Sequence, residues 1–314
     1  MINNILRKLS SYLSIFFKNK PLLKSKNIEI LEEINQRLIN QKKNINTNLK
    51  KTHIKFNLQI YDLLKSKKIE KFLRKNFIQK MFFVHNRFFI YKELIHLKNN
   101  KNWKFYKKLL IEDDVGDPIR YFLYPKSSGN RINHVFHLSI LIDEFKVDLK
   151  KIKSVFEFGA GYGCMARIFS KINGNIKYQC FDTFLVNLLQ YYYLQHNKLN
   201  VGFSFKNNFF LNSNFNYLEK YNKKNFNYLF IANWSLSETP IKFRKKFETT
   251  INNSKYILIS FQEKFENINN LNYFRELKNK ISNNFQIKIV KNQFYNGNFI
   301  KKQNHFYFLG KKVK

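Results

Sequence analysis

The chain has little glycine, proline, cysteine or acidic side chain. Its 314 residues include nine glycines and four prolines, which excludes collagen-like and Gly/Pro-rich low-complexity proteins. No apolar run approaches the roughly 18 residues of a membrane-spanning helix, so we do not expect a helical transmembrane protein. With 44% hydrophobic and 18% aromatic residues, wholesale disorder is not expected either. At roughly 100–200 residues per domain, the length suggests about two domains or one large one with an appended region.

The two cysteines, Cys164 and Cys180, are too few for a disulfide scaffold and form no Cys-x-x-Cys pair. We expect reduced thiols and a cytoplasmic protein. The first 24 residues are basic but lack the apolar stretch and cleavage site of a signal peptide. Apolar residues recur at helical spacing over 2–17, which suits an interfacial membrane helix or a helix that packs on its own protein.

Charge is strongly one-sided, with 57 basic and 21 acidic side chains and a net charge of +36. Such a balance favours anionic partners, namely nucleic acid, anionic lipid or phosphorylated substrates. Most basic residues are lysine, and the chain is also rich in Asn, Ile and Phe. AT-rich codons across a whole proteome produce the same mixture, so the charge has a purely compositional explanation as well.

The pattern along the chain predicts a helical N-terminal region, 1–112, and an α/β domain, 113–314. Residues 1–112 lack glycine and carry apolar residues three and four apart, as at Ile28, Leu31, Ile34 and Leu38. Residues 113–130 are expected to be a connecting loop that caps a helix over 131–145. Beyond that, expected strands at 154–158, 176–182, 201–205, 227–233, 256–261, 285–292 and 305–312 alternate with expected helices at 163–172, 184–196, 239–252 and 268–284.

This alternation predicts a parallel sheet with helices on both faces. The last two strands have no helix between them, so they must form a hairpin or place one strand antiparallel.

Three of the nine glycines, Gly159, Gly161 and Gly163, follow the first expected strand and open a helix. Glycine there allows a tight turn and lets a ligand approach the amides at the helix N-terminus. Glu157 lies two residues before the first glycine, and Asp182 ends the next strand. Because ligands of open α/β sheets bind outside the carboxyl ends of the strands, Asp182 is placed to accept hydrogen bonds from ribose hydroxyls.

The glycine turn and Asp182 together resemble the first two motifs of class I S-adenosylmethionine-dependent methyltransferases, over roughly 150–314. The resemblance implies a Rossmann-like seven-stranded sheet with one antiparallel strand. Segments between 116 and 240, including 127–138 and 232–238, are similar to the bacterial sugar O-methyltransferases, which are associated with surface glycans. That family usually has Asp-Leu-Pro after the second strand, whereas this chain has Asp182-Thr183-Phe184, so the acid is kept but the residues of the turn after it differ.

The resemblance implies S-adenosylmethionine as the cofactor, and a deprotonated acceptor oxygen is what the chemistry needs. Glu238, after the fourth strand, and His134, on the 131–145 helix, are the candidate bases, although Glu238 could equally be an N-terminal acid of the following helix. Arg131 is a candidate for anion binding or a solvated side chain, and no third ligand accompanies His134 and His137 to suggest a metal. The expected cofactor residues are Glu157, Gly159, Ala160, Gly161, Gly163, Asp182 and Asn233, with Arg131 and Trp234 for the substrate.

Trp234 and Ser235 follow Asn233 where amino-methylating relatives carry Pro-Pro-aromatic, which argues against methylation of a base nitrogen. We therefore expect O-methylation of a sugar hydroxyl in a nucleotide-sugar or surface glycan. An RNA methyltransferase, or a non-catalytic protein that binds the cofactor or the surface of an anionic membrane, are the alternatives.

Overall fold

The structure is a computed structural model, and it describes residues 24–40, 51–66, 68–82, 88–217, 227–294 and 304–313. The N-terminal part is helical, as predicted, although residues 2–17 lie outside the described residues. Leu31, Ile34 and Leu38 are buried along one face of the first helix, whereas Ile28 is exposed. The helices are α2 (Lys24–Asn40), α3 (Lys51–Lys65), the 3-10 helix η2 (Lys68–Arg74), α4 (Asn76–Met81), α5 (Phe88–Asn99) and α6 (Trp103–Leu109).

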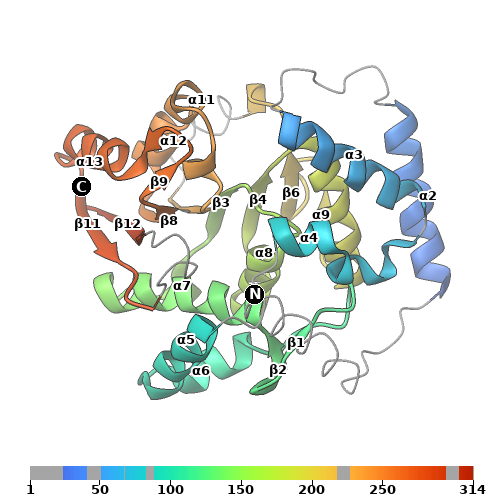
Figure 1. Ribbon diagram of the computed structural model, residues 1–314, viewed down its shortest axis with the longest axis horizontal. Helices are drawn as coiled ribbons and strands as arrows, with labels where there is room; N and C mark the ends of the chain where they lie inside the picture. Colours follow the sequence, from blue (N-terminus) through green and yellow to red (C-terminus); the bar gives the residue numbers. More distant parts are fainter. Residues whose placement is uncertain are drawn as a thin grey trace.

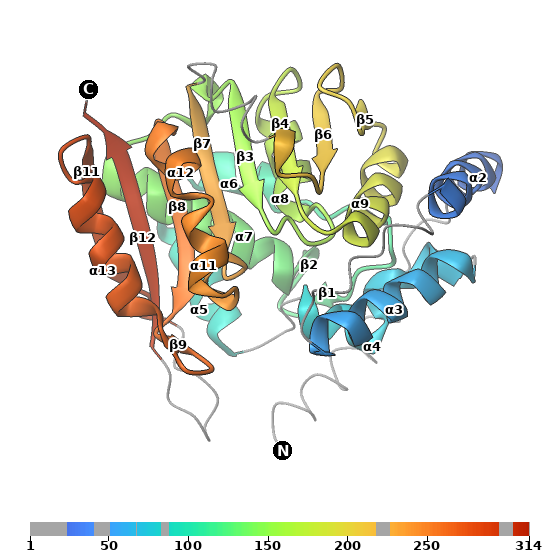
Figure 2. The same ribbon diagram turned by 90° about the horizontal axis from the view of Figure 1, so that it is seen from above.

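A mostly parallel sheet of eight strands forms the centre of the molecule, in the order β11-β12-β8-β7-β3-β4-β6-β5 (Figure 2). The strand β12 is antiparallel to both β8 and β11, and every other neighbouring pair is parallel. The strands are β3 (Ser154–Phe158), β4 (Lys177–Phe181), β5 (Val201–Gly202), β6 (Phe209–Asn212), β7 (Tyr228–Asn233), β8 (Tyr256–Gln262), β11 (Phe285–Lys291) and β12 (His305–Lys312).

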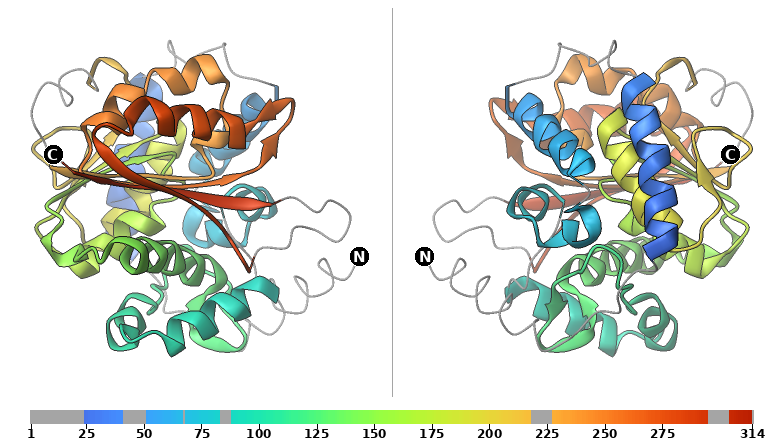
Figure 3. Two further views of the ribbon diagram at one scale, coloured as in Figure 1. Left: turned by 90° about the vertical axis from the view of Figure 1, so that its left-hand side faces the viewer. Right: turned by 90° about the vertical axis from the view of Figure 1, so that its right-hand side faces the viewer.

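Helices cover both faces of this sheet, which confirms the predicted α/β architecture (Figures 1 and 3). One face carries α7 (Gly129–Phe145), α8 (Cys164–Ile172) and α9 (Phe184–His196), and the other carries α11 (Ile241–Lys245), α12 (Glu248–Asn253) and α13 (Asn270–Ile281). Ser128 caps α7 through its Oγ, which accepts a hydrogen bond from the Arg131 amide at 3.2 Å. None of the helices in the described part of the chain is both long and apolar enough to cross a membrane.

Four details differ from the sequence predictions. The sheet has eight strands rather than seven, because strand β6 was not predicted. It lies between β4 and the edge strand β5, with which it pairs. The expected loop 113–130 contains a hairpin of β1 (Arg120–Tyr121) and β2 (Tyr124–Ser128). The strand expected at 201–205 is only two residues long. The helix expected at 239–252 is broken between α11 and α12, where Phe247 turns inward and its ring centroid lies 4.6 Å from that of Phe158.

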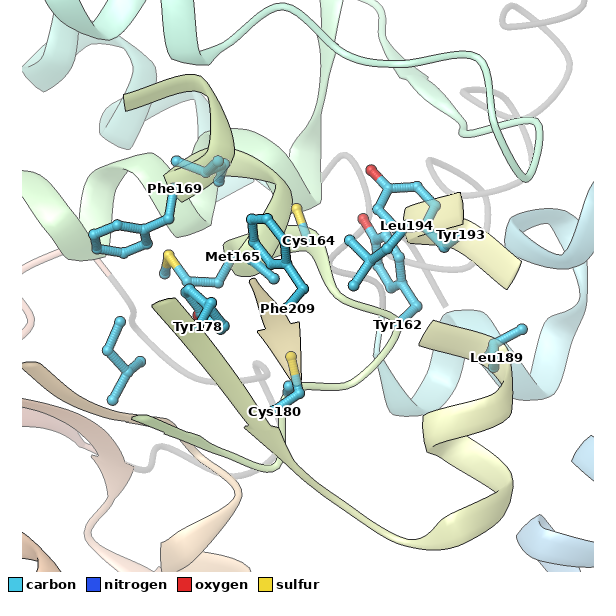
Figure 4. Packing of buried hydrophobic residues seen from close by; sticks show 14 of the residues in the cluster. Tyr162, Cys164, Met165, Phe169, Tyr178, Cys180, Leu189, Tyr193, Leu194 and Phe209 are labelled. Carbon is cyan, nitrogen blue, oxygen red and sulfur yellow. The ribbon is translucent and has the colours of Figure 1, made fainter. Parts of the chain in front are cut away.

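The remaining short elements are the 3-10 helices η3 (Leu149–Lys151) and η4 (Leu236–Glu238) and the hairpin of β9 (Lys264–Phe265) and β10 (Ile268–Asn269). A hydrophobic core lies on each side of the sheet. The core under α7, α8 and α9 also includes buried residues of α2, α3 and η2, so side chains on both sides of residue 112 share it. Cys164 and Cys180 are free thiols buried within this core (Figure 4).

Candidate active site at the switch point of the sheet

The direction in which the chain adds strands to the sheet reverses between β3 and β7. From β3 the chain proceeds to β4 on one side, and it returns later to place β7 on the other. A crevice forms outside the carboxyl ends of the strands at such a switch point, and ligands of open α/β sheets bind there. A functional site is therefore expected at the loops that follow β3 and β7.

The glycine turn after β3 takes a conformation that side chains rarely adopt. Gly159, Gly161 and Gly163 have φ of 69°, 56° and 96°, all in the left-handed region that favours glycine. Gly163 is the N-cap residue of α8, and Ala160 is buried within the turn. The turn is anchored to the neighbouring strand because the Gly159 amide donates to the Phe181 carbonyl at 2.8 Å.

Asp182 meets this turn directly. Its Oδ2 accepts a hydrogen bond from the Gly161 amide at 3.1 Å, and its Oδ1 accepts one from the Thr183 amide at 2.8 Å. Burial raises the pKa of the Asp182 carboxyl to about 7, against the lowering effect of these two backbone donors. The structure thus brings together the two features that the sequence singled out, the glycine turn and the acid after the second strand.

Glu157 lies within β3, whereas Asp182 lies just beyond the end of β4. It is buried, its Oε2 accepts a hydrogen bond from the Tyr178 hydroxyl at 2.7 Å, and burial raises its pKa to about 8. A carboxyl held in this way supports the strand from which the glycine turn springs. Asp182, in contrast, is only partly buried and bonds to the glycine turn itself.

The loop after β7 packs against the glycine turn. Trp234 has a φ of 63°, an uncommon value for a non-glycine residue and one that tends to occur at functional sites. Its amide donates to the Ser260 carbonyl at 2.8 Å, and its ring centroid lies 5.5 Å from that of His305. Asn233 Oδ1 accepts from Ser260 Oγ at 3.3 Å, while its Nδ2 is buried without a partner among the described residues. An orphaned donor at the switch point is suited to hold a ligand oxygen.

A row of polar side chains from β7, β8 and β12, the polar row, lies on one face of the sheet. Side chains alternate between faces along a strand, and the register pairs Asn233 with Ser260, Ser260 with Tyr307, and Gln262 with His305. Leu258 and Leu309 lie two residues from Ser260 and Tyr307 on the same strands, so they point to the same face. Both belong to the core under α7, so these polar residues face α7 as well. Gln262 and His305 were not predicted; Gln262 ends β8, whereas His305 begins β12 and reaches the same edge because β12 is antiparallel.

Glu238 is joined to this row through Gln262. Gln262 Nε2 donates to Glu238 Oε1 at 3.3 Å, and Gln262 Oε1 accepts from Ser237 Oγ at 2.8 Å. Burial raises the pKa of the Glu238 carboxyl to about 7. A carboxyl with a pKa near neutrality is suited to accept a proton at physiological pH.

His134 lies on α7, and its ring centroid is 6.1 Å from that of His137. Burial, and then the neighbouring Arg131, lower the pKa of His134 to about 4, so its imidazole is neutral at pH 7. Its Nδ1 is buried and has no partner in the described part of the chain. One turn further on, His137 Nδ1 lies 2.7 Å from the Tyr307 hydroxyl. His134 is therefore an available acceptor, but a weaker base than Glu238.

Arg131 is not a solvated side chain. It is fully buried, with Nε donating to Glu112 Oε1 at 2.8 Å and Nη2 donating to Asp113 Oδ2 at 2.8 Å and to the Tyr193 hydroxyl at 3.1 Å. Asp113 is held further by Arg167 at 2.8 Å. These bonds place the guanidinium in a buried ion-pair cluster with Glu112 and Asp113, while Arg131 Nη1 is buried without a partner among the described residues.

A further buried acid, Glu93 of α5, lies behind α7 and was not suggested by the sequence. It is fully buried, and Asn133 Nδ2 donates to its two carboxylate oxygens at 2.9 and 3.1 Å. Burial raises its pKa to about 8. No local signal marks Glu93, because only the tertiary packing of α5 on α7 removes it from water. Among the described residues, no group of three or more His, Cys, Asp and Glu side chains is arranged to hold a metal ion.

No protein-family model matches this chain, and no curated protein matches it. Solved structures are similar to it at low identity. The StiE O-methyltransferase has 15% identity and a TM-score of 0.40, over 56% of this chain and 72% of that one. A protein described as a sarcosine dimethylglycine methyltransferase from Galdieria sulphuraria has 13% identity and a TM-score of 0.41, over 57% of this chain and 87% of that one. A protein described as an RNA methyltransferase from Pyrococcus horikoshii has 15% identity and a TM-score of 0.38, over 72% of this chain and 98% of that one. Because likeness of this degree assigns no activity, we infer function from the site itself.

Proposed function

We propose that this protein is an S-adenosylmethionine-dependent methyltransferase that methylates a hydroxyl group of a sugar. The observation that carries the proposal is the bond between the Gly161 amide and the Asp182 carboxylate, which joins the loops after β3 and β4 beside the switch point. This contact unites a glycine turn, a helix N-terminus and an acid at one rim, the combination that binds nucleoside ligands in open α/β sheets.

The residues present suit this cofactor. Asp182 offers carboxylate oxygens for ribose hydroxyls, and the orphaned Asn233 Nδ2 offers a donor. When bound, the cofactor supplies a methyl group already activated by a sulfonium. The protein's own task is to orient the acceptor oxygen and to take its proton.

A neutral hydroxyl acceptor suits the polar row. Ser260, Gln262 and Tyr307 are uncharged, and the lowered pKa of His134 keeps its imidazole neutral. Such groups exchange hydrogen bonds with hydroxyls. Glu238, whose pKa lies near 7, is the group we assign to accept the hydroxyl proton, with His134 orienting the acceptor.

Calorimetric titration of the full chain with S-adenosylhomocysteine tests the cofactor assignment. We expect micromolar or tighter binding, and Asp182→Ala should weaken it by about 1.5–3 kcal/mol, the scale of a hydrogen bond to a charged group. Asp148→Asn, an exposed acid that caps η3, should bind as the wild type does. Absence of binding by the wild-type chain would refute the proposal. Transfer of labelled methyl from the cofactor to nucleotide-sugars and glycans would then identify the acceptor.

RNA methylation is the second candidate, because a net charge of +36 favours a polyanion. Binding through many phosphates weakens steeply with salt, with a logarithmic slope near −0.7 per contact for single strands. We expect a shallow salt dependence for the true acceptor. A slope of about −5 or steeper, with affinity that grows with RNA length, would favour the RNA methyltransferase instead.

A further inference from the structure

A side chain from the N-terminal helical region lies directly on the glycine turn. Phe82 follows α4, and a Cβ built on Gly161 would lie 3.3 Å from its Cδ1 and 3.5 Å from its Cγ. These are contact distances, so the Phe82 ring packs against the Cα of Gly161. Figure 2 shows α3 and α4 at the end of the sheet where β7 and β8 terminate.

The segment that carries Phe82 is fixed firmly at this position. The Phe56 and Phe82 ring centroids lie 5.2 Å apart in an edge-to-face arrangement, and the Phe56 and Phe77 centroids lie 5.9 Å apart. At the start of the segment, the Leu73 amide donates to the Gly116 carbonyl at 3.0 Å. The position of Phe82 is therefore determined by packing within the helical region and by attachment to the lead-in of the α/β domain.

The same segment also covers the next residue of the turn. The Phe72 ring lies 5.9 Å from that of Tyr162 and 6.3 Å from that of Tyr193 on α9. Figure 4 shows Tyr162 and Tyr193 side by side. Residues 68–82 thus contact two successive positions of the glycine turn, one through a fully buried ring and one through the half-buried ring of Phe82.

We propose that Phe82 forms an apolar wall of the cofactor site, so that the N-terminal helical region completes a site that the α/β domain begins. The inference rests on the proposed function. Phe82 and the Asp182 carboxylate flank the same glycine, and the ring is only half-buried, which leaves part of its surface for a nucleoside. An apolar ring there keeps water from the Asp182 carboxylate and strengthens its hydrogen bonds to ligand hydroxyls.

Titration of the full chain with S-adenosylhomocysteine tests this assignment. Phe82→Ala should weaken binding by about tenfold or more, since it removes an apolar contact surface. Phe82→Leu should retain most of the affinity. Phe77→Ala is the matched control, because Phe77 packs on Phe56 in the same cluster, and it should change affinity by less than about threefold.

A spectroscopic measurement separates contact with the ligand from a merely structural role. In Phe82→Trp, addition of S-adenosylhomocysteine should change the tryptophan emission with the same saturation curve as calorimetry, whereas Phe77→Trp should respond no more than the wild type. Unchanged or tighter binding by Phe82→Ala, with binding by Asp182→Ala weakened, would overturn the role of Phe82 and leave the proposed function intact. Absence of binding by the wild type would overturn both.

Discussion

Gly159 and Ser235 touch across the switch point between β3 and β7. A Cβ built on Gly159 would lie 2.2 Å from Ser235 Cβ, and Ser235 Oγ donates to the Phe158 carbonyl at 2.5 Å. The turn that binds the cofactor in our proposal and the loop that carries the candidate base are therefore in direct contact. Any side chain at residue 159 must separate them.

Gly159→Ala should consequently destabilise the fold. The left-handed φ of 69° costs roughly 1–2 kcal/mol for a residue with a Cβ, and overpacking adds typically about 1–3 kcal/mol. We expect a loss of about 2–5 kcal/mol in the free energy of unfolding, measured by urea denaturation. Gly174→Ala is the control, since a Cβ there meets no atom within 4 Å, and it should be close to neutral. Equal effects of the two substitutions would contradict the contact.

The buried carboxyl of Glu93 should make stability depend on pH. Its pKa rises from 4.5 to about 8 on folding, so the folded state holds a proton that the unfolded state releases. This contribution to stability is complete below about pH 4.5 and is lost as the pH rises through about 8. Relative to the wild type, Glu93→Gln should therefore gain about 1.4 kcal/mol per pH unit between pH 5 and 8. Urea unfolding across this range measures the difference, and parallel pH curves for the two proteins would exclude it.

Arg131→Met should be strongly destabilising. The substitution leaves Glu112 buried without its cationic partner, and removal of one member of a buried ion pair costs about 3–5 kcal/mol. Arg37→Met removes a half-exposed pair with Glu33 and should cost less than about 1 kcal/mol. Chemical denaturation of both variants provides the comparison. A small loss for Arg131→Met would favour the predicted role of this residue as a ligand-binding side chain.

Local sequence signals predicted much of the fold. The strands at 154–158 and 305–312 and the helix at 184–196 have the expected bounds, because apolar runs, glycines and caps lie next to one another there. The strand β6 was missed because the segment around it is rich in Asn and has no clear alternation. The break before Phe247 was missed because it depends on a contact with Phe158, a residue distant in sequence.

In the candidate site, too, some features were predictable from local sequence and others depend on contacts between distant segments. The glycine turn and Asp182 carry their own signals, since glycine spacing and a strand-end acid are visible in one dimension. The burial of Arg131 depends on Glu112, Asp113 and Tyr193, which approach it from two distant parts of the chain. The contact of Phe82 with Gly161 joins residues 79 positions apart, and no pattern in either segment indicates it.

The assignment of the base yields the sharpest functional prediction. From unperturbed values, histidine suits proton abstraction better than a carboxylate, but burial reverses the order here: the pKa of His134 falls to about 4 and that of Glu238 rises to about 7. Glu238→Gln should leave the affinity for S-adenosylhomocysteine nearly intact and lower turnover by about a hundredfold or more, because a positioned base contributes roughly 10²–10⁴-fold. His134→Ala should cost less.

The pH profile of turnover distinguishes the two candidate bases. If Glu238 takes the proton, the wild-type rate should rise through about pH 7 to a plateau as this carboxyl ionises, and Glu238→Gln should lose that step. A base with the lowered pKa of His134 would instead give a rate that is already constant above about pH 5. Glu276→Gln, an exposed acid on α13, controls for the loss of a charge and should behave as the wild type does. Normal turnover by Glu238→Gln together with an inactive His134→Ala would reverse the roles, and normal turnover by both would mean that orientation alone drives the reaction.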